Sequence, residues 1–333
     1  MTILVTGGLG FIGSHTVVEF VEQGRDCLII DNLSKSTPEV LHRIESIVQK
    51  EVPFVQMDLL DKEGLKKVFE ENDISSVVHF AGFKSVSESV QNPLMYYQNN
   101  LISTLNLLEV MNEYNVKNLV FSSSATVYGD LHTPPLKEDL SLHAPNPYGR
   151  TKLILEEILQ DFVLANDGWS IALMRYFNPI GAHKSGLLGE LPFGIPNNLM
   201  PHVLKVANKE VIKLQVFGGD YETSDGTCIR DFIHIMDLAN GHVHALQYIE
   251  KYNGCEAFNL GTGEGYSVLD LINTFEQVND VNVPFEIVAR REGDIVSSIA
   301  DVTKARDLLN WKTKYDLKDM CKDSWKWYLD IKE

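Results

Sequence analysis

The sequence has little cysteine, no long apolar run and a shortage of positive charge, and each shortage restricts what the protein can be. Its four cysteines have no CxxC spacing, so neither a disulfide framework nor a metal site is predicted. No apolar stretch near the start is long enough for a signal or a membrane span, so we expect a cytoplasmic protein. The chain has only 29 Lys and Arg but 46 Asp and Glu, and this excess of negative charge argues against a nucleic-acid or anionic-membrane partner.

The remaining composition is that of an ordinary folded enzyme. Hydrophobic residues make up 44% of the 333 residues and charged residues 23%. This length suits one large α/β domain with an appendage, or two domains that share a cleft. Because the net charge is −17, an anionic ligand would have to meet a local cluster of cationic or N–H groups.

Short apolar runs alternate with amphipathic runs through the first half of the chain. Nearly continuous apolar strands separated by helices predict an α/β fold with a doubly wound parallel sheet. The expected strands are 3–6, 27–31, 54–57, 76–80, 118–123 and 170–177, and the expected helices lie near 11–23, 38–50, 61–71, 93–114 and 147–165.

The alternation stops after Phe177, where Gly, Pro and Asn become frequent. We therefore expect a Rossmann-type domain over 1–177 and a smaller C-terminal α/β substrate-binding domain over 178–333. Segments near 230–262 are expected to pack back on the first domain.

A glycine-rich turn, VTGGLGFIGSHT, joins the first expected strand to the first helix. Gly8, Gly10 and Gly13 satisfy GxGxxG, while Gly7, Gly10 and Gly13 give the TGxxGxxG variant. Glycines allow the tight turn and the close approach of a pyrophosphate to the helix N-terminus, where N–H groups favour an anion. The turn therefore predicts a dinucleotide-binding site.

Two carboxylates follow expected strands at the same edge of the sheet. Asp31 ends the second strand, eighteen residues past Gly13, where a carboxylate accepts both ribose hydroxyls and repels a 2′-phosphate. This favours NAD over NADP, and the alternative role for Asp31 is that of a turn or N-cap residue. Asp58, after the third strand, either reaches the adenine or caps a loop.

The chain contains two Tyr-x-x-x-Lys pairs, and the surrounding sequence separates them. Tyr148 and Lys152 open the helix after the fifth strand, which ends in Ser122 to Ser124 at the edge where ligands of such folds bind. Tyr328 and Lys332 have the same spacing without any supporting feature. A Ser, a Tyr and a Lys are thus expected to meet beside the nicotinamide, with Ser124, Tyr148 and Lys152 as catalytic residues.

This combination resembles the extended short-chain dehydrogenase/reductase superfamily and, over nearly the whole chain, the UDP-glucose 4-epimerase family, also called UDP-galactose 4-epimerases. The motifs that carry the resemblance are HFAGFKSVSESVQNPLMYYQNN (79–100), SSSATVYGD (122–130), RYFNPIGAH (175–183), IPNNLMP (195–201), DGTCIRDFIHIMDLANGH (225–242), NLGTGEGYSVLD (259–270) and RREGD (290–294).

The resemblance implies an NAD-dependent isomerase that interconverts UDP-glucose and UDP-galactose through a transient 4-keto sugar. Tyr148, as a phenolate, would take the proton of the 4-hydroxyl, and Ser124 would orient that hydroxyl. Lys152 would hold the nicotinamide ribose and, with the positive ring, lower the pKa of the phenol. The NAD contacts so implied are Gly7, Gly10, Phe11, Ile12, Gly13, Asp31, Asn32, Asp58, Leu59, Phe80, Ala81, Gly82, Lys84, Asn99, Tyr148, Lys152 and Phe177.

The resemblance also implies a site for the UDP-sugar. Arg230 and Arg291 would grip the diphosphate, because guanidinium groups bind phosphate oxygens bidentately. Ser298 stands where a bulky Tyr is typical of family members restricted to plain hexoses, so UDP-GlcNAc and UDP-GalNAc are also expected substrates, unless Ser298 is an ordinary loop residue. The implied substrate contacts are Ser124, Asn178, Asn198, Leu199, Phe217, Arg230, Arg291, Asp294 and Ser298.

Three alternatives stay open on the sequence. Related 4,6-dehydratases carry an Asp-Glu pair where this chain has Ala125 and Thr126, and decarboxylating relatives carry a Glu there. A non-catalytic dinucleotide-binding regulator would typically lack the Tyr or the Lys.

The apolar faces of 93–114 and 147–165 further predict a homodimer.

Overall fold

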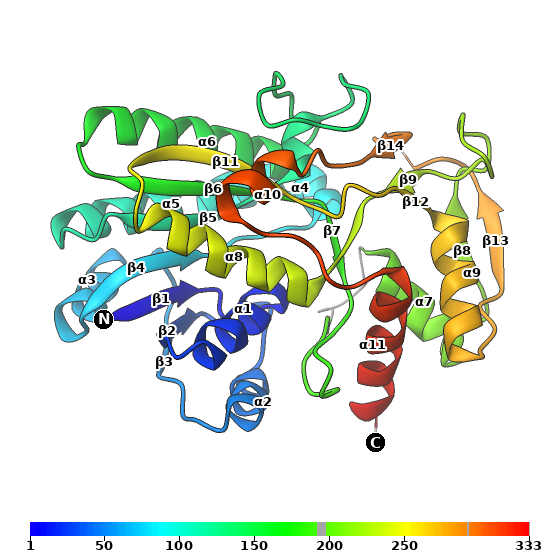
Figure 1. The fold of residues 1–333 in the computed structure, drawn as a ribbon, viewed down its shortest axis with the longest axis horizontal. Helices are drawn as coiled ribbons and strands as arrows, with labels where there is room; N and C mark the ends of the chain where they lie inside the picture. Colours follow the sequence, from blue (N-terminus) through cyan, green and yellow to red (C-terminus); the bar gives the residue numbers. More distant parts are fainter. Residues whose placement is uncertain (192–197, 292, 333) are drawn as a thin grey trace.

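The computed structural model describes residues 1–191, 198–291 and 293–332 and is built around one parallel sheet (Figure 1). Seven strands lie in the order β11-β6-β5-β4-β1-β2-β3, and every neighbouring pair is parallel. The strand order reverses between β1 and β4, so the predicted doubly wound sheet is confirmed. The strands are β1 Thr2–Thr6, β2 Asp26–Asp31, β3 Phe54–Gln56, β4 Ile74–His79, β5 Asn118–Ser124, β6 Ser170–Tyr176 and β11 Gly254–Leu260.

Helices cover both faces of this sheet, because successive side chains of a strand point to opposite faces. In β1, Ile3 and Val5 pack in the cluster that contains α1, α2 and α8, whereas Leu4 packs in the cluster that contains α3, α5 and α6. All three side chains are fully buried. The helices are α1 Phe11–Glu22, α2 Pro38–Val48, α3 Lys62–Glu71, α5 Pro93–Glu113, α6 Pro147–Ala165 and α8 Ile235–Ile249.

A smaller region, at the right of Figure 1, lies beside the sheet and has its own hydrophobic cluster. Its strands form three short sheets, with β8 beside β13, β7 beside β10, and β9 between β12 and β14. The strands are β7 Asn178–Ile180, β8 Leu214–Phe217, β9 Ile229–Arg230, β10 Phe232–His234, β12 Tyr266–Ser267, β13 Phe285–Val288 and β14 Ser297–Ser298. The helices of this region are α7 Leu199–Ala207, α9 Val268–Asn279 and α11 Leu317–Asp330, whereas α10 Thr303–Leu309 packs in the same cluster as α1 and α8.

Three elements from the second half of the chain pack with the seven-stranded sheet and its helices. Strand β11 pairs with β6 along its whole length, helix α8 packs against α1, and helix α10 packs against α8 and β11. The division of the chain into two domains at residue 177 stays a prediction. These elements lie beyond residue 177 in the sequence but pack with the sheet formed by the residues before it.

The sequence did not predict α4, Val86–Gln91, or the 3₁₀ turn η1, Ala125–Tyr128. Both are too short to show a helical repeat of apolar residues. Among the residues that the structure describes, no helix is long and apolar enough to cross a membrane, and no three His, Cys, Asp or Glu side chains are grouped as a metal site would need.

Candidate active site

The turn between β1 and α1 has the space and the polarity that a pyrophosphate needs. A Cβ atom on Gly7, which has a φ of +66°, would lie 2.7 Å from the backbone N of Ala81. A Cβ atom on Gly13 would lie 2.3 Å from the Gly7 carbonyl oxygen, so neither position admits a side chain. Gly10 is the N-cap of α1 and brings no side-chain cap, and the first turn holds no acidic residue. The first N–H groups of α1 are therefore suited to an anion. Phe11 and Ile12 begin that helix.

Asp31 lies buried at the end of β2, beside this turn. Its Oδ2 accepts a hydrogen bond from the Leu9 N–H at 3.1 Å, and its Oδ1 accepts one from the Ser36 hydroxyl at 2.8 Å. The neighbouring Asn32 amide donates to Asp58 Oδ2 at 2.9 Å. The two predicted adenosine carboxylates therefore lie at adjacent strand ends, and Asn32 joins them.

The end of β4 supplies the next group of predicted cofactor contacts. Phe80 packs its ring 4.9 Å from that of His242, and Ala81 follows against the glycine turn. The Asn99 amide donates to the Asn100 side-chain oxygen at 3.0 Å, which also lies 3.3 Å from the position of a Cβ on Gly82. Leu59 is buried in the core, so only its backbone is available to a ligand.

One carboxylate joins a predicted cofactor residue to a predicted substrate residue. Glu190 Oε1 lies 3.2 Å from Lys84 Nζ and accepts a hydrogen bond from the Asn198 amide at 2.7 Å. Asn198 precedes α7, whose first residue is Leu199. Part of the motif around Asn198, residues 192–197, lies outside the described residues.

The first turn of α6 presents Tyr148 and Lys152, as the sequence predicted. Asn146 caps the helix by accepting a hydrogen bond from the Gly149 N–H at 2.8 Å, and Pro147 is the first helical residue. The Lys152 ammonium is buried and donates to the Ser122 carbonyl oxygen at 2.6 Å and to the Ser122 hydroxyl at 3.2 Å. Helix α6 is thus fixed to the carboxyl end of β5.

Burial within the protein shifts the pKa of both the Tyr148 phenol and the Lys152 ammonium. Burial raises the pKa of the Tyr148 phenol, and a hydrogen bond with Ser124 opposes that rise. Burial lowers the pKa of the Lys152 ammonium to about 8, and the Glu156 carboxylate opposes that fall. The sequence led us to expect a lowered pKa for Tyr148, and the protein chain by itself produces the opposite direction. The reason is that the Lys152 ammonium is directed to Ser122, while the phenol loses water.

The predicted diphosphate residues meet at one carboxylate. Arg291 donates to Asp294 Oδ1 at 2.8 Å, and Arg230 Nη2 lies 3.9 Å from the same oxygen. The Arg291 guanidinium also lies over the Phe217 ring, 5.7 Å from its centre. Two arginines, one carboxylate and one aromatic ring therefore come together from three separate segments of the chain.

Ser298 lies beside this cluster. Strand β14 pairs with β9 so that Ser298 is opposite Arg230, and the Asp231 N–H donates to the Ser298 carbonyl oxygen at 2.9 Å. The Asp231 carbonyl oxygen in turn accepts from the Asn178 N–H at 3.0 Å. Phe177, one residue earlier, is buried in a separate small hydrophobic cluster.

Sequence reasoning missed the carboxylates that support the predicted residues. Glu156 stands one helical turn after Lys152, Glu190 joins Lys84 to Asn198, and the buried Asp231 carboxylate accepts four hydrogen bonds from the segments around Thr262 and Ala300. For Glu156 a signal existed, because a carboxylate on the same helix face as a buried lysine is expected to interact with it.

Comparison with known proteins agrees with this geometry. A family model described as GDP-mannose 4,6 dehydratase matches residues 4–324. The UDP-glucose 4-epimerase of Bacillus subtilis (strain 168) is 54% identical over 327 residues, which cover 98% of this chain and 96% of the relative. The chain belongs to the UDP-glucose 4-epimerase family. It is therefore an isomerase of the extended short-chain dehydrogenase/reductases.

Solved structures of this family share the whole fold. The UDP-glucose 4-epimerase of Stenotrophomonas maltophila, solved with bound NAD and formylated UDP-arabinopyranose, has a TM-score of 0.98 and 47% identity, over 100% of this chain and 99% of that one. The UDP-Glc/GlcNAc 4-epimerase of Campylobacter jejuni has a TM-score of 0.86 and 38% identity, over 99% of each chain.

The turn after β5 bears on the dehydratase alternative. Ala125 and Thr126 begin η1, where the dehydratases carry an acidic pair. Thr126 uses its N–H and its hydroxyl to contact the Ser124 hydroxyl, at 3.2 and 3.0 Å. Neither residue can act as the acid or base that water elimination needs.

Proposed function

We propose that this chain is an NAD-dependent 4-epimerase that interconverts UDP-glucose and UDP-galactose through a transient 4-keto sugar, and that it also accepts UDP-GlcNAc and UDP-GalNAc. One observation carries the proposal: Ser124, Tyr148 and Lys152 converge at the carboxyl edge of the sheet that holds the glycine turn. Acid-base groups at a dinucleotide site are what reversible oxidation of a sugar hydroxyl requires.

The residues around the glycine turn fit NAD. The side-chain-free cradle at Gly7, Gly10 and Gly13 would hold the pyrophosphate, and Asp31 would hold the adenosine ribose. When bound, NAD supplies a hydride acceptor for C4 and later the hydride donor. The buried Asp31 carboxylate would repel the extra phosphate of NADP.

Tyr148 moves the proton of the sugar 4-hydroxyl, and its charge is the central requirement. For a base poised near pH 7, the pKa of the phenol must fall from about 10 to about 7, a difference of roughly 4 kcal/mol. Burial acts in the wrong direction, so the lowering requires the positive nicotinamide ring together with the Lys152 ammonium. Ser124 orients the hydroxyl that reacts.

The arginine cluster suits the diphosphate of the substrate. In the protein chain by itself, Arg230 and Arg291 share the Asp294 carboxylate. A diphosphate brings more negative charge than one carboxylate and can take bidentate hydrogen bonds from both guanidinium groups. The strongly acidic protein thereby receives an anionic substrate at a locally cationic site.

The small side chain of Ser298 supports the acetylated substrates. Ser298 is buried opposite Arg230, so a larger side chain there would occupy space beside the substrate cluster. The Campylobacter jejuni neighbour is described as a UDP-Glc/GlcNAc enzyme. A serine leaves volume for an acetamide, whereas a bulky residue would impose a steric cost.

A substitution at this position tests the sugar range. Ser298→Tyr should abolish turnover of UDP-GalNAc and preserve most turnover of UDP-galactose, whereas Ser297→Tyr, on the opposite face of the same strand, should preserve both. Equal loss of both activities in Ser298→Tyr would contradict the steric explanation.

The decisive experiment for the proposed function is incubation of the purified protein with UDP-galactose and, separately, with UDP-GalNAc, without added cofactor. We expect the 4-epimer of each, with no net production of NADH. A protein that carries NAD and converts neither sugar would instead be a dinucleotide-binding regulator. Conversion of UDP-galactose alone would refute the claim on acetylated sugars.

We also propose a cytoplasmic homodimer. Four free cysteines, three of them buried, suit a reducing compartment. The apolar side chains of Leu94, Ile102 and Leu105 are exposed on α5, and Ile102 and Leu105 share one helix face. Light scattering should give the mass of two chains, and a monomer would rule the dimer out.

A further inference from the structure

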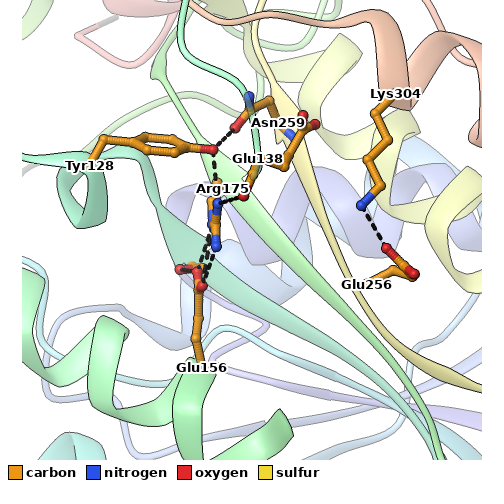
Figure 2. Close-up of polar contacts among 8 residues, drawn as sticks. Tyr128, Glu138, Glu156, Arg175, Glu256, Asn259 and Lys304 are labelled. Atoms are coloured by element: carbon orange, nitrogen blue, oxygen red, sulfur yellow. Dashed lines mark hydrogen bonds and ion pairs between the residues drawn. The ribbon is translucent and has the colours of Figure 1, made fainter. Parts of the chain in front are cut away.

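A buried polar network lies behind the catalytic residues and centres on one ion pair (Figure 2). Glu156 and Arg175 are 1% and 2% exposed. Arg175 donates to Glu156 through Nη2 at 2.7 Å and through Nε at 3.1 and 3.2 Å. Figure 2 shows the Arg175 guanidinium between Glu156 and the Tyr128 hydroxyl, to which its Nη1 donates at 3.0 Å.

The Glu156 side of this network reaches the catalytic strand end. The Ser123 hydroxyl donates a hydrogen bond to Glu156 Oε1. Ser123 lies between Ser122, which accepts hydrogen bonds from Lys152, and Ser124, which contacts Tyr148. A single carboxylate is therefore bonded to the strand that positions two catalytic side chains.

Glu156 is also placed to act on the charge of Lys152. Both residues belong to α6, four positions apart, so their side chains share one helix face. The groups that face Lys152 from the neighbouring strands carry no compensating negative charge: Ser122 is neutral, Phe121 presents its ring 4.9 Å from Nζ, and burial lowers the pKa of His79 to about 3, which keeps it neutral. Burial raises the pKa of Tyr176, which bonds to Ser122, so this phenol is neutral as well. In the proposed reaction the Tyr148 phenolate, on the same helix as Lys152, also bears negative charge.

We propose that Glu156 is a positioning residue for the reaction: its carboxylate keeps the buried Lys152 ammonium charged and, through Ser123, fixes the end of β5 that carries Ser124. This inference rests on the role proposed above for Lys152. Arg175 pairs with the same carboxylate, so its positive charge would have the opposite effect on Lys152 once Glu156 no longer neutralises it.

The two members of the pair therefore predict opposite changes. Lys152 has a pKa of about 8, so the rate is expected to fall above that pH as the ammonium is lost. Glu156→Gln removes the favourable anion and leaves Arg175, so the alkaline limb of the kcat profile should move down by roughly one pH unit, about 10-fold in rate on that limb. Arg175→Met leaves Glu156 as a lone anion, so the limb should move up. Glu156→Asp, which keeps the charge, should restore the wild-type limb.

The experiment needs a control for folding and a readout that does not depend on turnover. Breaking a buried ion pair is strongly destabilising, so the double variant Glu156→Gln/Arg175→Met, which removes both charges, serves as the stable reference. NMR of isotopically labelled lysine, assigned with Lys152→Met, measures the ionisation of Lys152 directly in the NAD-bound protein.

The outcomes separate this inference from the proposed function. Opposite shifts of the Lys152 ionisation in Glu156→Gln and Arg175→Met support the inference, even if the protein converts no sugar. Shifts in the same direction, or lowered kcat with an unmoved Lys152 ionisation, would overturn it and leave Glu156 a structural residue. Wild-type protein without epimerase activity would overturn only the proposed function.

Discussion

The two Tyr-x-x-x-Lys pairs of this chain have the same spacing and opposite surroundings. Tyr328 donates a hydrogen bond to Glu210 Oε1 at 2.8 Å, and Lys332 Nζ lies 3.0 Å from the same oxygen. Burial and the Glu210 carboxylate both raise the pKa of the Tyr328 phenol. Lys332 is half exposed, so water screens its charge. This pair holds the last helix, α11, against the segment after α7.

At the first pair, the phenol meets a hydroxyl and the lysine is buried. Tyr148 contacts Ser124, and Lys152 contacts Ser122, at the edge of the sheet beside the glycine turn. A carboxylate bonded to a phenol stabilises its protonated form, whereas a serine hydroxyl can donate to the phenolate. The third group and the place in the fold, rather than the spacing, decide which tyrosine can act as a base.

The largest effect is expected from removing the Tyr148 hydroxyl, with removal of the Tyr328 hydroxyl as the matched control. Tyr148→Phe should lower kcat by about 10²–10⁴-fold while NAD stays bound, because the proton acceptor is lost. Tyr328→Phe should leave kcat unchanged and cost about 1 kcal/mol of stability, since it removes one hydrogen bond to Glu210. Steady-state kinetics with UDP-galactose and thermal unfolding measure both. Similar kcat values for Tyr148→Phe and Tyr328→Phe would show that the first pair is not chemical.

An intermediate effect is expected from giving Tyr148 the environment of Tyr328. Ser124→Asp places a carboxylate beside the phenol, which raises its pKa and should lower the rate at pH 7 by about 10–10²-fold. Relative to Ser124→Ala, the rate should rise as the pH rises, because the phenol then ionises, while loss of the Lys152 ammonium above about pH 8 affects both variants. Ser124→Ala is the matched control, and it should lose activity without this alkaline recovery. Parallel pH profiles of the two variants would contradict the electrostatic explanation.

The smallest effect concerns acid stability, for which the two regions have different pH windows. Burial lowers the pKa of His79, near Lys152, to about 3, so the unfolded chain binds a proton from about pH 6.5 downward that the folded chain does not. This stability is present above pH 6.5 and is lost as the pH falls. Hydrogen bonds, the first from Asn208, lower the pKa of Glu210 to about 2, so its contribution is lost only below about pH 4.5.

Two variants separate these windows. His79→Gln should reduce the loss of unfolding free energy between pH 6.5 and 4.5 by about 2 kcal/mol, whereas Glu210→Gln should change the slope of unfolding free energy against pH mainly below pH 4.5. Urea unfolding at several pH values measures both slopes. An unchanged slope in His79→Gln above pH 4.5 would show that the histidine is not held neutral.

The sequence predicted the features that depend on local pattern. Buried apolar runs predicted the six strands β1 to β6, and the glycine spacing predicted the turn in which the structure leaves no room for a Cβ atom on Gly7 or Gly13. The position of Tyr148 and Lys152 in the first turns of α6 was predicted because Asn146 suits an N-cap and Pro147 the first helical position. These are properties of a residue and its near neighbours.

The features that the sequence did not predict depend on contacts between distant segments. Glu190 meets Lys84 across 106 positions, and Glu156 on helix α6 meets Arg175 on strand β6. The lowered pKa expected for Tyr148 with NAD bound stays a prediction, and the rise that burial causes in the protein chain by itself was not foreseen, because spacing indicates a nearby lysine but not where its ammonium is directed. Burial and side-chain direction are three-dimensional quantities, so periodicity cannot supply them.

The most direct test of the account is the ionisation of the Tyr148 phenol in the NAD-bound protein. Ultraviolet difference spectra between wild type and Tyr148→Phe, recorded over a pH series, isolate the phenolate absorbance of this one residue. The account predicts that the phenol ionises near pH 7, about three pH units below its ordinary value, once NAD is bound. A phenol that stays protonated up to about pH 10 with NAD bound would contradict it.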